Sequence, residues 1–268
     1  MLRKPAVAGY FYPREADDLR AMVRRLVDPG AKKEKALAVV VPHAGFVYSG
    51  TVAGAVYSSV EIPDRVVILG PSHRGSRSVF GIMSEGDWQT PLGKVPVDAE
   101  LARAIGDRSP LVREDPGGHA AEHSLEVQLP FLQLLKSSFS IVPVCVSSAA
   151  GFDDLENLAE ALAGAITASG GKTLLVASTD MSHYVSRETA QRLDFLAIDR
   201  MLGFDARGLF DVVRRLDISM CGYQPTTAVL LAAKTLGAIK AELVLYRTSG
   251  DVSGDFDQVV GYAGLRLL

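Results

Sequence analysis

The segment Val66-Val67-Ile68-Leu69-Gly70-Pro71-Ser72-His73 decides the fold class of this 268-residue chain. Its run of four apolar residues before a Gly-Pro turn predicts a fully buried strand. Open α/β sheets bind their ligands just beyond the carboxyl ends of such strands, which is where His73 falls. The segment therefore predicts a buried α/β sheet and a histidine at its functional edge.

Two other apolar segments end in the same way. A run of three valines leads through a proline to His43. The segment 174–177, Leu-Leu-Val-Ala, leads to Asp180 and His183. If the three strands are parallel neighbours, their ends converge, and we predict one shared site that also contains His73.

Strands and amphipathic helices alternate along the rest of the chain. The patterns predict strands at 36–41, 65–69, 79–83, 140–146, 173–177, 242–246 and 259–267, and helices at 15–27, 49–60, 98–105, 152–168, 188–201, 206–216 and 226–236. This alternation is typical of a three-layer α/β/α fold with a mixed, mainly parallel sheet. No repeat or linker indicates a second domain, so we predict a single domain over residues 1–268.

Composition narrows the class of protein. The formal net charge is −3 and the basic residues are scattered, which argues against a nucleic-acid partner. No apolar run approaches the ~20 residues of a membrane span, and no apolar stretch follows the first charges as in a signal peptide. The two cysteines give no disulfide framework. We therefore expect a cytoplasmic protein.

Histidine and cysteine at these positions suggest a metal site. Imidazole is the commonest metal ligand near neutral pH, and His43 and His73 are the first two candidates. Cys221 precedes a predicted helix, whose N-terminus favours thiolate, so it is the third candidate. Such a set suits Fe(II), Cu or Zn, and ligand type alone does not choose among them. A buried, inert Cys221 is the alternative, and Cys145, inside an apolar strand, is expected in the core.

Asp180, His183 and His123 are candidates for proton transfer. Asp180 has three possible roles: a ligand, a partner that fixes an imidazole tautomer, or a helix N-cap. His183 is a candidate ligand or general base. If 119–129 is helical, His123 enters the pocket from it and His119 lies at the rim. The sequence His-Ala-Ala-Glu-His there differs from the zincin motif, because its glutamate immediately precedes the second histidine.

A second chemistry uses the same residues. Cys221, His183 and Asp180 could form the nucleophile, base and orienting group of a cysteine hydrolase. Such a triad leaves His43 and His73 without a role. Among aromatic residues, Trp88 and Tyr184 are expected near the pocket mouth. The Tyr10-Phe11-Tyr12 cluster forms either an arm pinned to the domain or a wall of the pocket.

Several motifs together resemble those of the Memo family, in order and rough spacing from about Pro5 to Leu268. They are Ala8–Pro13 (AGYFYP), Pro42–Gly45 (PHAG), Gly70–His73 (GPSH), Thr90–Gly93 (TPLG), Glu122–Phe131 (EHSLEVQLPF), Ser178–Tyr184 (STDMSHY) and Cys221-Gly222. The family is similar in fold to the LigB-like extradiol non-haem iron dioxygenases. The resemblance therefore implies a LigB-like fold.

The resemblance also implies roles for individual residues. His43 and His73 correspond to the two histidine ligands of the dioxygenases, and Cys221 stands in place of their glutamate ligand. His183 corresponds to the base, Asp180 to a nearby pocket carboxylate, and His123 to a second histidine that handles protons or O₂. A thiolate ligand makes the site softer and more easily oxidised than a carboxylate does, which argues against ring opening.

Three hypotheses for function follow. The first is a mononuclear Fe(II) or Cu site, with Zn also possible, that performs redox or O₂-dependent chemistry on a small substrate. The second is a non-catalytic protein that binds a peptide or small ligand in an inherited pocket. The third is a cysteine or zinc hydrolase. The family resemblance adds a radical-SAM protein as a candidate partner, since microbial members tend to be encoded near one.

Overall fold

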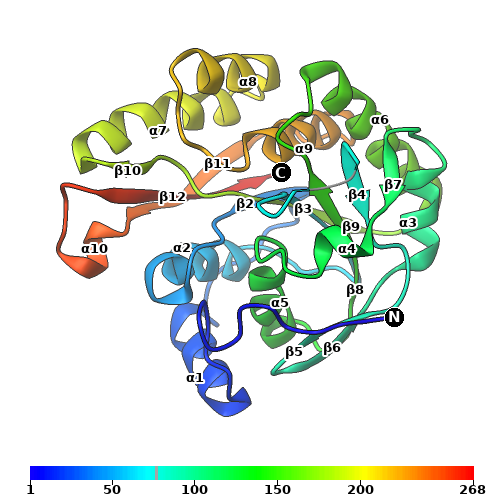
Figure 1. Cartoon of the computed structure of the whole chain (residues 1–268), viewed down its shortest axis with the longest axis horizontal. Coiled ribbons are helices and arrows are strands. Elements are labelled where there is room, and N and C mark those ends of the chain that lie inside the picture. Colours follow the sequence, from blue (N-terminus) through cyan, green and yellow to red (C-terminus); the bar gives the residue numbers. More distant parts are fainter. Residues whose placement is uncertain (76–77) are drawn as a thin grey trace.

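The computed structural model describes residues 1–75 and 78–268 (Figure 1). Four parallel strands form the centre of its main sheet, in the order β2 (Ala38–Val41), β9 (Thr173–Ser178), β3 (Arg65–Pro71) and β8 (Ser140–Val146). They are buried on both faces, which explains their continuous apolar sequences. Because β2, β9 and β3 are neighbours, the prediction that three strand ends meet is confirmed.

Antiparallel and short strands complete this mixed sheet. The strand β12 (Val259–Leu267) pairs antiparallel with β2, and β4 (Phe80–Ile82) pairs antiparallel with β8. The outer strands are β10 (His183–Val185) and β11 (Ala241–Thr248), which pair with β12, and β7 (Val112–Glu114), which pairs with β4. A separate small sheet contains β1 (Leu2–Arg3), β5 (Asp87–Thr90) and β6 (Gly93–Pro96).

Helices cover both faces of the main sheet, as the three-layer prediction requires (Figure 1). One face packs against α1 (Ala16–Leu26), α2 (Phe46–Ser58) and α5 (Leu129–Leu135). The other packs against α3 (Ala99–Gly106), α6 (Phe152–Ser169), α7 (Arg187–Leu202), α8 (Ala206–Arg215) and α9 (Tyr223–Thr235). Successive strand residues alternate between the two cores: Val39 and Val41 face the first, Ala38 and Val40 the second. No helix of the described residues is long and apolar enough to cross a membrane.

The segment 119–129 is not the single helix that its histidine spacing suggested. The short helix α4 (Pro116–His119) ends at His119, where the segment starts. A 3₁₀ turn (Glu126–Gln128) near the end of the segment leads into α5. The pair Gly117-Gly118 weakens the first part, and the Glu122 carboxylate accepts a hydrogen bond from the Ser124 amide, which competes with helix formation. His123 therefore reaches the pocket from an irregular loop.

Two other helices begin three residues earlier than predicted. The helix α2 starts at Phe46 and α9 at Tyr223. In α9 the residue Pro225 lies in the first turn, where a missing amide hydrogen costs nothing. The earlier starts of α2 and α9 bring the N-termini of both helices closer to the strand-end pocket. The last short helix is α10 (Gly250–Ser253).

Gly54 allows α2 to approach the end of α1. A Cβ atom added at Gly54 would lie 2.0 Å from the carbonyl oxygen of Leu26. Backbone cannot move aside as a flexible side chain can, so we expect Gly54→Ala to lower the free energy of unfolding by about 1–3 kcal/mol. Urea denaturation followed by circular dichroism measures this change.

Gly106 provides the matched control. It is also a helical glycine, at the end of α3, but an added Cβ would meet nothing within 4 Å. Gly106→Ala should therefore leave stability unchanged or raise it by less than about 1 kcal/mol through helix propensity. Equal effects of the two substitutions would contradict the close-approach argument.

Candidate metal centre

The six predicted site residues converge on one cavity. Its volume is about 510 Å³, and it lies beyond the carboxyl ends of β2, β3 and β9. Its lining includes His43, His73, His123, Asp180, His183 and Cys221. A larger cavity of about 780 Å³ opens at the opposite edge of the sheet, and its described lining contains neither histidine nor cysteine. The chemistry therefore belongs to the smaller cavity.

Three imidazoles form the centre of the site. One ring nitrogen from each of His43, His73 and His123 lies within 4.8 Å of the others. The ring centroid of His43 is 5.3 Å from that of His73 and 5.4 Å from that of His123. The His73 and His123 rings are stacked, with centroids 4.5 Å apart. Nitrogen atoms this close can bind one ion together.

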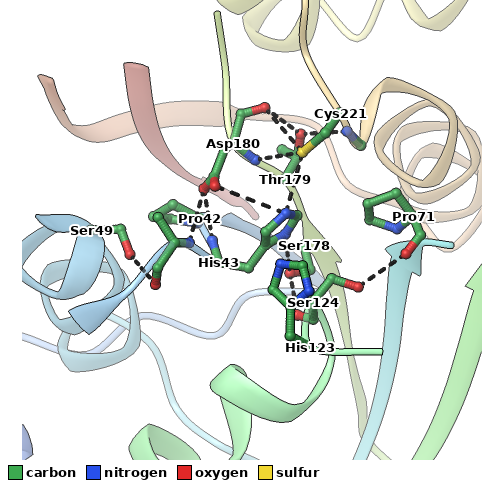
Figure 2. Close-up of polar contacts among 12 residues, drawn as sticks. Pro42, His43, Ser49, Pro71, His123, Ser124, Ser178, Thr179, Asp180 and Cys221 are labelled. Carbon is green, nitrogen blue, oxygen red and sulfur yellow. Dashed lines mark hydrogen bonds and ion pairs between the residues drawn. The ribbon is translucent and has the colours of Figure 1, made fainter. Parts of the chain in front are cut away.

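A buried hydrogen-bond network fixes the tautomer of His43. Ser178 donates its only hydroxyl hydrogen to the Ser124 carbonyl at 2.6 Å (Figure 2). Its oxygen accepts from Gln128 Nε2 at 2.9 Å. His43 Nδ1, 3.0 Å from the same oxygen, must therefore be the donor. This leaves His43 Nε2 with a lone pair directed at the cavity.

Glu122 performs the same task for His73. Its carboxylate accepts from the His73 amide at 2.7 Å and from His73 Nδ1 at 2.9 Å. Burial alone would raise the pKa of Glu122, but the hydrogen bonds from His73 and Ser124 outweigh it and lower that pKa to about 2. An ionised carboxylate only accepts, so Nδ1 carries a hydrogen and Nε2 is the ring nitrogen left for other contacts. This carboxylate–histidine arrangement is typical of metal sites.

His123 lies between Glu122 and the N-terminal segment. Its Nδ1 is 3.4 Å from the Glu122 carboxylate, and its ring packs 4.7 Å from the ring of Phe11. Burial, followed by the charges of neighbouring imidazoles, lowers the pKa of His43 to about 3 and that of His123 to about 4. Both rings are thus neutral at neutral pH, the state that binds metals.

Cys221 lies beside His43 at the start of α9. Its Sγ is 3.2 Å from His43 Nε2 and accepts from the Asp180 amide at 3.3 Å (Figure 2). A Cβ atom at Gly222 would lie 2.5 Å from the Ser178 carbonyl oxygen, so glycine permits this close approach. Contrary to the expectation from the helix N-terminus, the pKa of Cys221 is raised, because burial and the Asp180 carboxylate dominate. A bound cation is what would favour the thiolate here.

Asp180 supports His43 from the other side. Its Oδ1 accepts from the amides of His43 and Ala44 at 2.8 Å and 3.3 Å, and its Oδ2 is 3.9 Å from His43 Nε2. Burial raises the pKa of Asp180. The carboxylate therefore holds the turn between β2 and α2 rather than capping a helix of its own segment, and it borders the cavity.

His183 lies at the mouth of the cavity. Its Nδ1 is 2.8 Å from the Ser219 carbonyl, which only accepts, so Nδ1 carries the hydrogen and Nε2 is free to accept a proton. The imidazole hydrogen-bonded to Cys221 is His43, so the predicted Cys221–His183–Asp180 triad is not the arrangement found. Tyr184, 74 % exposed, lines the mouth as expected.

Two predicted positions were wrong. His119 is fully buried rather than at the rim, with the centroid of its ring 5.9 Å from that of Trp88 in an edge-to-face arrangement. Trp88 is also fully buried, beneath the Arg3 guanidinium in the small sheet, because β1 pairs with β5 there. Both lie outside the cavity lining. The two alternatives for the N-terminal cluster both hold in part: Tyr12 is buried, and Phe11 forms a wall of the cavity.

Sequence reasoning missed the groups that orient the imidazoles. Glu122, Ser178 and Gln128 are fully buried polar residues, and each contacts a histidine or its partner. The sequence pattern that could have identified them is the presence of polar side chains within otherwise apolar segments. The donor set fits a metal ion: three imidazoles, two of them with Nδ1 engaged by a buried partner, and an adjacent thiol.

Comparison with known proteins identifies the family and the fold. The family model described as Memo-like protein matches residues 3–266. A MEMO1 family protein of Methanopyrus kandleri is 42% identical, covering 99% of this chain and 98% of its own. One from Archaeoglobus fulgidus is 43% identical over 98% of each chain. Among solved structures, an uncharacterised protein of Escherichia coli K12 has the same fold, with a TM-score of 0.55, 13% identity and coverage of 85% and 99%.

The neutral histidines predict a pH dependence of stability. The folded-state pKa values of about 3 for His43 and about 4 for His123 lie below the ordinary 6.5, so the unfolded chain binds protons first. Metal-free protein should lose stability as the pH falls below 6.5. By pH 5 each ring contributes a loss of about 2 kcal/mol. Urea denaturation in EDTA at pH 7 and pH 5 measures it.

His123→Gln tests the assignment, because glutamine does not titrate. The loss between pH 7 and pH 5 should be smaller in this variant by about 2 kcal/mol. An identical loss in wild type and variant would show that His123 is already protonated in the folded protein.

Proposed function

Because the chain belongs to the Memo family, we propose that its strand-end cavity binds one metal ion and uses it in redox or O₂-dependent chemistry on a small substrate. The observation that carries the proposal is the cluster of three imidazoles within 4.8 Å. The second nitrogen of His43 and of His73 is occupied by Ser178 and Glu122, which leaves the other nitrogen available. Structural histidines seldom share such an arrangement.

The proposed ligands are His43, His73 and Cys221. His43 Nε2 and Cys221 Sγ, 3.2 Å apart, flank one position in the cavity, and His73 approaches it from β3. His123 belongs to the same imidazole cluster and is the proposed proton carrier or a further ligand. Imidazole and thiolate together suit Fe(II), Cu and Zn, of which Fe(II) and Cu support redox chemistry.

The ion, when bound, supplies electron transfer and Lewis acidity, and the chain supplies orientation and proton transfer. His183 Nε2 accepts a proton from a substrate at the cavity mouth, since Nδ1 is committed to Ser219. His123 offers a second proton-transfer group deeper in the cavity. Phe11 and Tyr184 narrow the entrance and restrict water.

Metal analysis of anaerobically purified protein tests the proposal. We expect about one Fe or Cu per chain in the wild type and less than about a tenth of that in the double variant His43→Ala/Cys221→Ser, since two of three ligands are gone. Elemental analysis by mass spectrometry measures it, with circular dichroism to check the fold.

His183→Gln is the matched control, because it changes a histidine of the same cavity that is not a proposed ligand. It should retain the metal at the wild-type level. A folded double variant with full metal content would contradict the ligand assignment. Absence of metal in the wild type, even after incubation with Fe(II), Cu(I) and Zn(II), would instead favour a non-catalytic ligand-binding pocket.

A further inference from the structure

The N-terminal segment 3–12, here called the arm, is attached to the loop that carries Glu122 and His123. The arm runs past α5 toward α2 (Figure 1), where the Phe11 carbonyl accepts a hydrogen bond from the Phe46 amide at 2.8 Å. The arm is fixed to the body of the protein by two buried charged residues, Arg3 of the arm itself and Glu126 of the 3₁₀ turn. The proposed chemistry uses neither residue.

Arg3 contacts three separate parts of the loop. Its Nε donates to the His119 carbonyl at 3.1 Å, and its Nη2 donates to the Glu122 carbonyl at 2.6 Å. Its Nη1 forms an ion pair with Glu126, and its guanidinium lies 4.4 Å from the centre of the Trp88 ring. The side chain is 3% exposed, so these interactions act with little screening.

Glu126 secures the arm to the same point. Its carboxylate accepts from the amides of Ala6 and Val7 at 2.8 Å and 3.1 Å, and from the Tyr12 hydroxyl at 2.5 Å. With Arg3, four donors therefore satisfy one fully buried carboxylate. Removing one partner of such a group leaves a buried charge that is poorly compensated.

Glu122 connects this cluster to the site. Its backbone carbonyl is held by Arg3, while its carboxylate holds the amide and Nδ1 of His73 and lies 3.4 Å from His123 Nδ1. The His123 ring also packs against Phe11 of the arm. The positions of the two stacked imidazoles thus depend on where Arg3 places the Glu122 backbone.

We propose that Arg3 is a positioning residue of the site: together with Glu126 it fixes Glu122, and through Glu122 the rings of His73 and His123. The part of this inference that concerns metal affinity rests on the proposed function, whereas the ring positions do not. Arginine is required because its planar fork reaches acceptors in several directions, which the single ammonium group of lysine cannot do.

The test compares Arg3→Lys with Arg266→Lys. Arg266, whose side chain is 20% exposed, is likewise held by a carboxylate and a backbone carbonyl, those of Glu242 and Ser59, near the opposite edge of the sheet. We expect Arg3→Lys to weaken Co(II) binding about 10–100-fold, as is usual for groups that orient metal ligands. Arg266→Lys should bind Co(II) as the wild type does, because neither Glu242 nor Ser59 lines the cavity. Wild-type affinity in Arg3→Lys would overturn the proposal.

Histidine side-chain NMR signals of metal-free protein provide a readout that needs no metal. In Arg3→Lys the ring signals of His73 and His123 should shift, while those of His183, held by Ser219, should not. This result would support positioning even if the wild type bound no Co(II), so failure of the proposed function is distinguishable. Unchanged His73 and His123 signals in a folded Arg3→Lys would refute the inference.

Tyr12→Phe covers the case in which Arg3→Lys does not fold. It removes one of the four donors to Glu126 and changes no other group of the cluster. The ring signal of His123 should shift relative to the wild type, because Glu126 and the arm are less firmly held. An unchanged His123 signal would overturn the proposal independently.

Discussion

The site depends on where one hydroxyl hydrogen points. Ser178 donates it to the Ser124 carbonyl, so His43 Nδ1 must act as a donor and Nε2 keeps its lone pair. This geometry exists because β2 and β9 are adjacent parallel strands whose register places Val41 opposite Ser178. These two residues are the last of their strands. The tautomer of His43 is therefore a consequence of strand pairing, and Gln128 secures it by donating to both Ser178 and the Pro42 carbonyl.

The second imidazole is held by different means with the same result. For His73 the acceptor is a buried carboxylate, Glu122, whose own charge is stabilised by the hydrogen bonds it receives. A neutral network on one side and an ionised group on the other give two nitrogen lone pairs in one cavity. Burying these polar groups costs free energy unless each finds a partner. The apolar sheet and its two helical layers supply the stability that offsets this cost.

The strand-end histidines could be predicted from the sequence because the pattern that marks them lies within one short segment. An apolar run followed by a turn and a histidine is visible in eight residues, and parallel neighbours bring such ends together. The groups that orient the imidazoles were not predicted. The bond from Glu122 to His73 and the bonds of Ser178 to Ser124 and Gln128 join residues 49 or more positions apart in the sequence. Trp88 and His119 were misplaced for the same reason: pairing of the first residues with β5 buries them. The helix N-terminus correctly marked Cys221, but burial decides the protonation of its thiol.

The protonation state of Cys221 links the metal-free and metal-bound proteins. With Nε2 of His43 unprotonated, the one hydrogen of the Cys221 thiol has two acceptors beside the cavity, His43 Nε2 at 3.2 Å and the Asp180 carbonyl at 3.6 Å. A divalent ion held by His43 Nε2 and Cys221 Sγ would displace this proton to solvent, and its charge would favour the thiolate that burial disfavours. Glu122, whose pKa is lowered to about 2, adds negative charge beside His73 at the same cavity. A hydrogen bond from the Cys221 thiol and a cation bound by its thiolate would therefore exclude each other in this cavity.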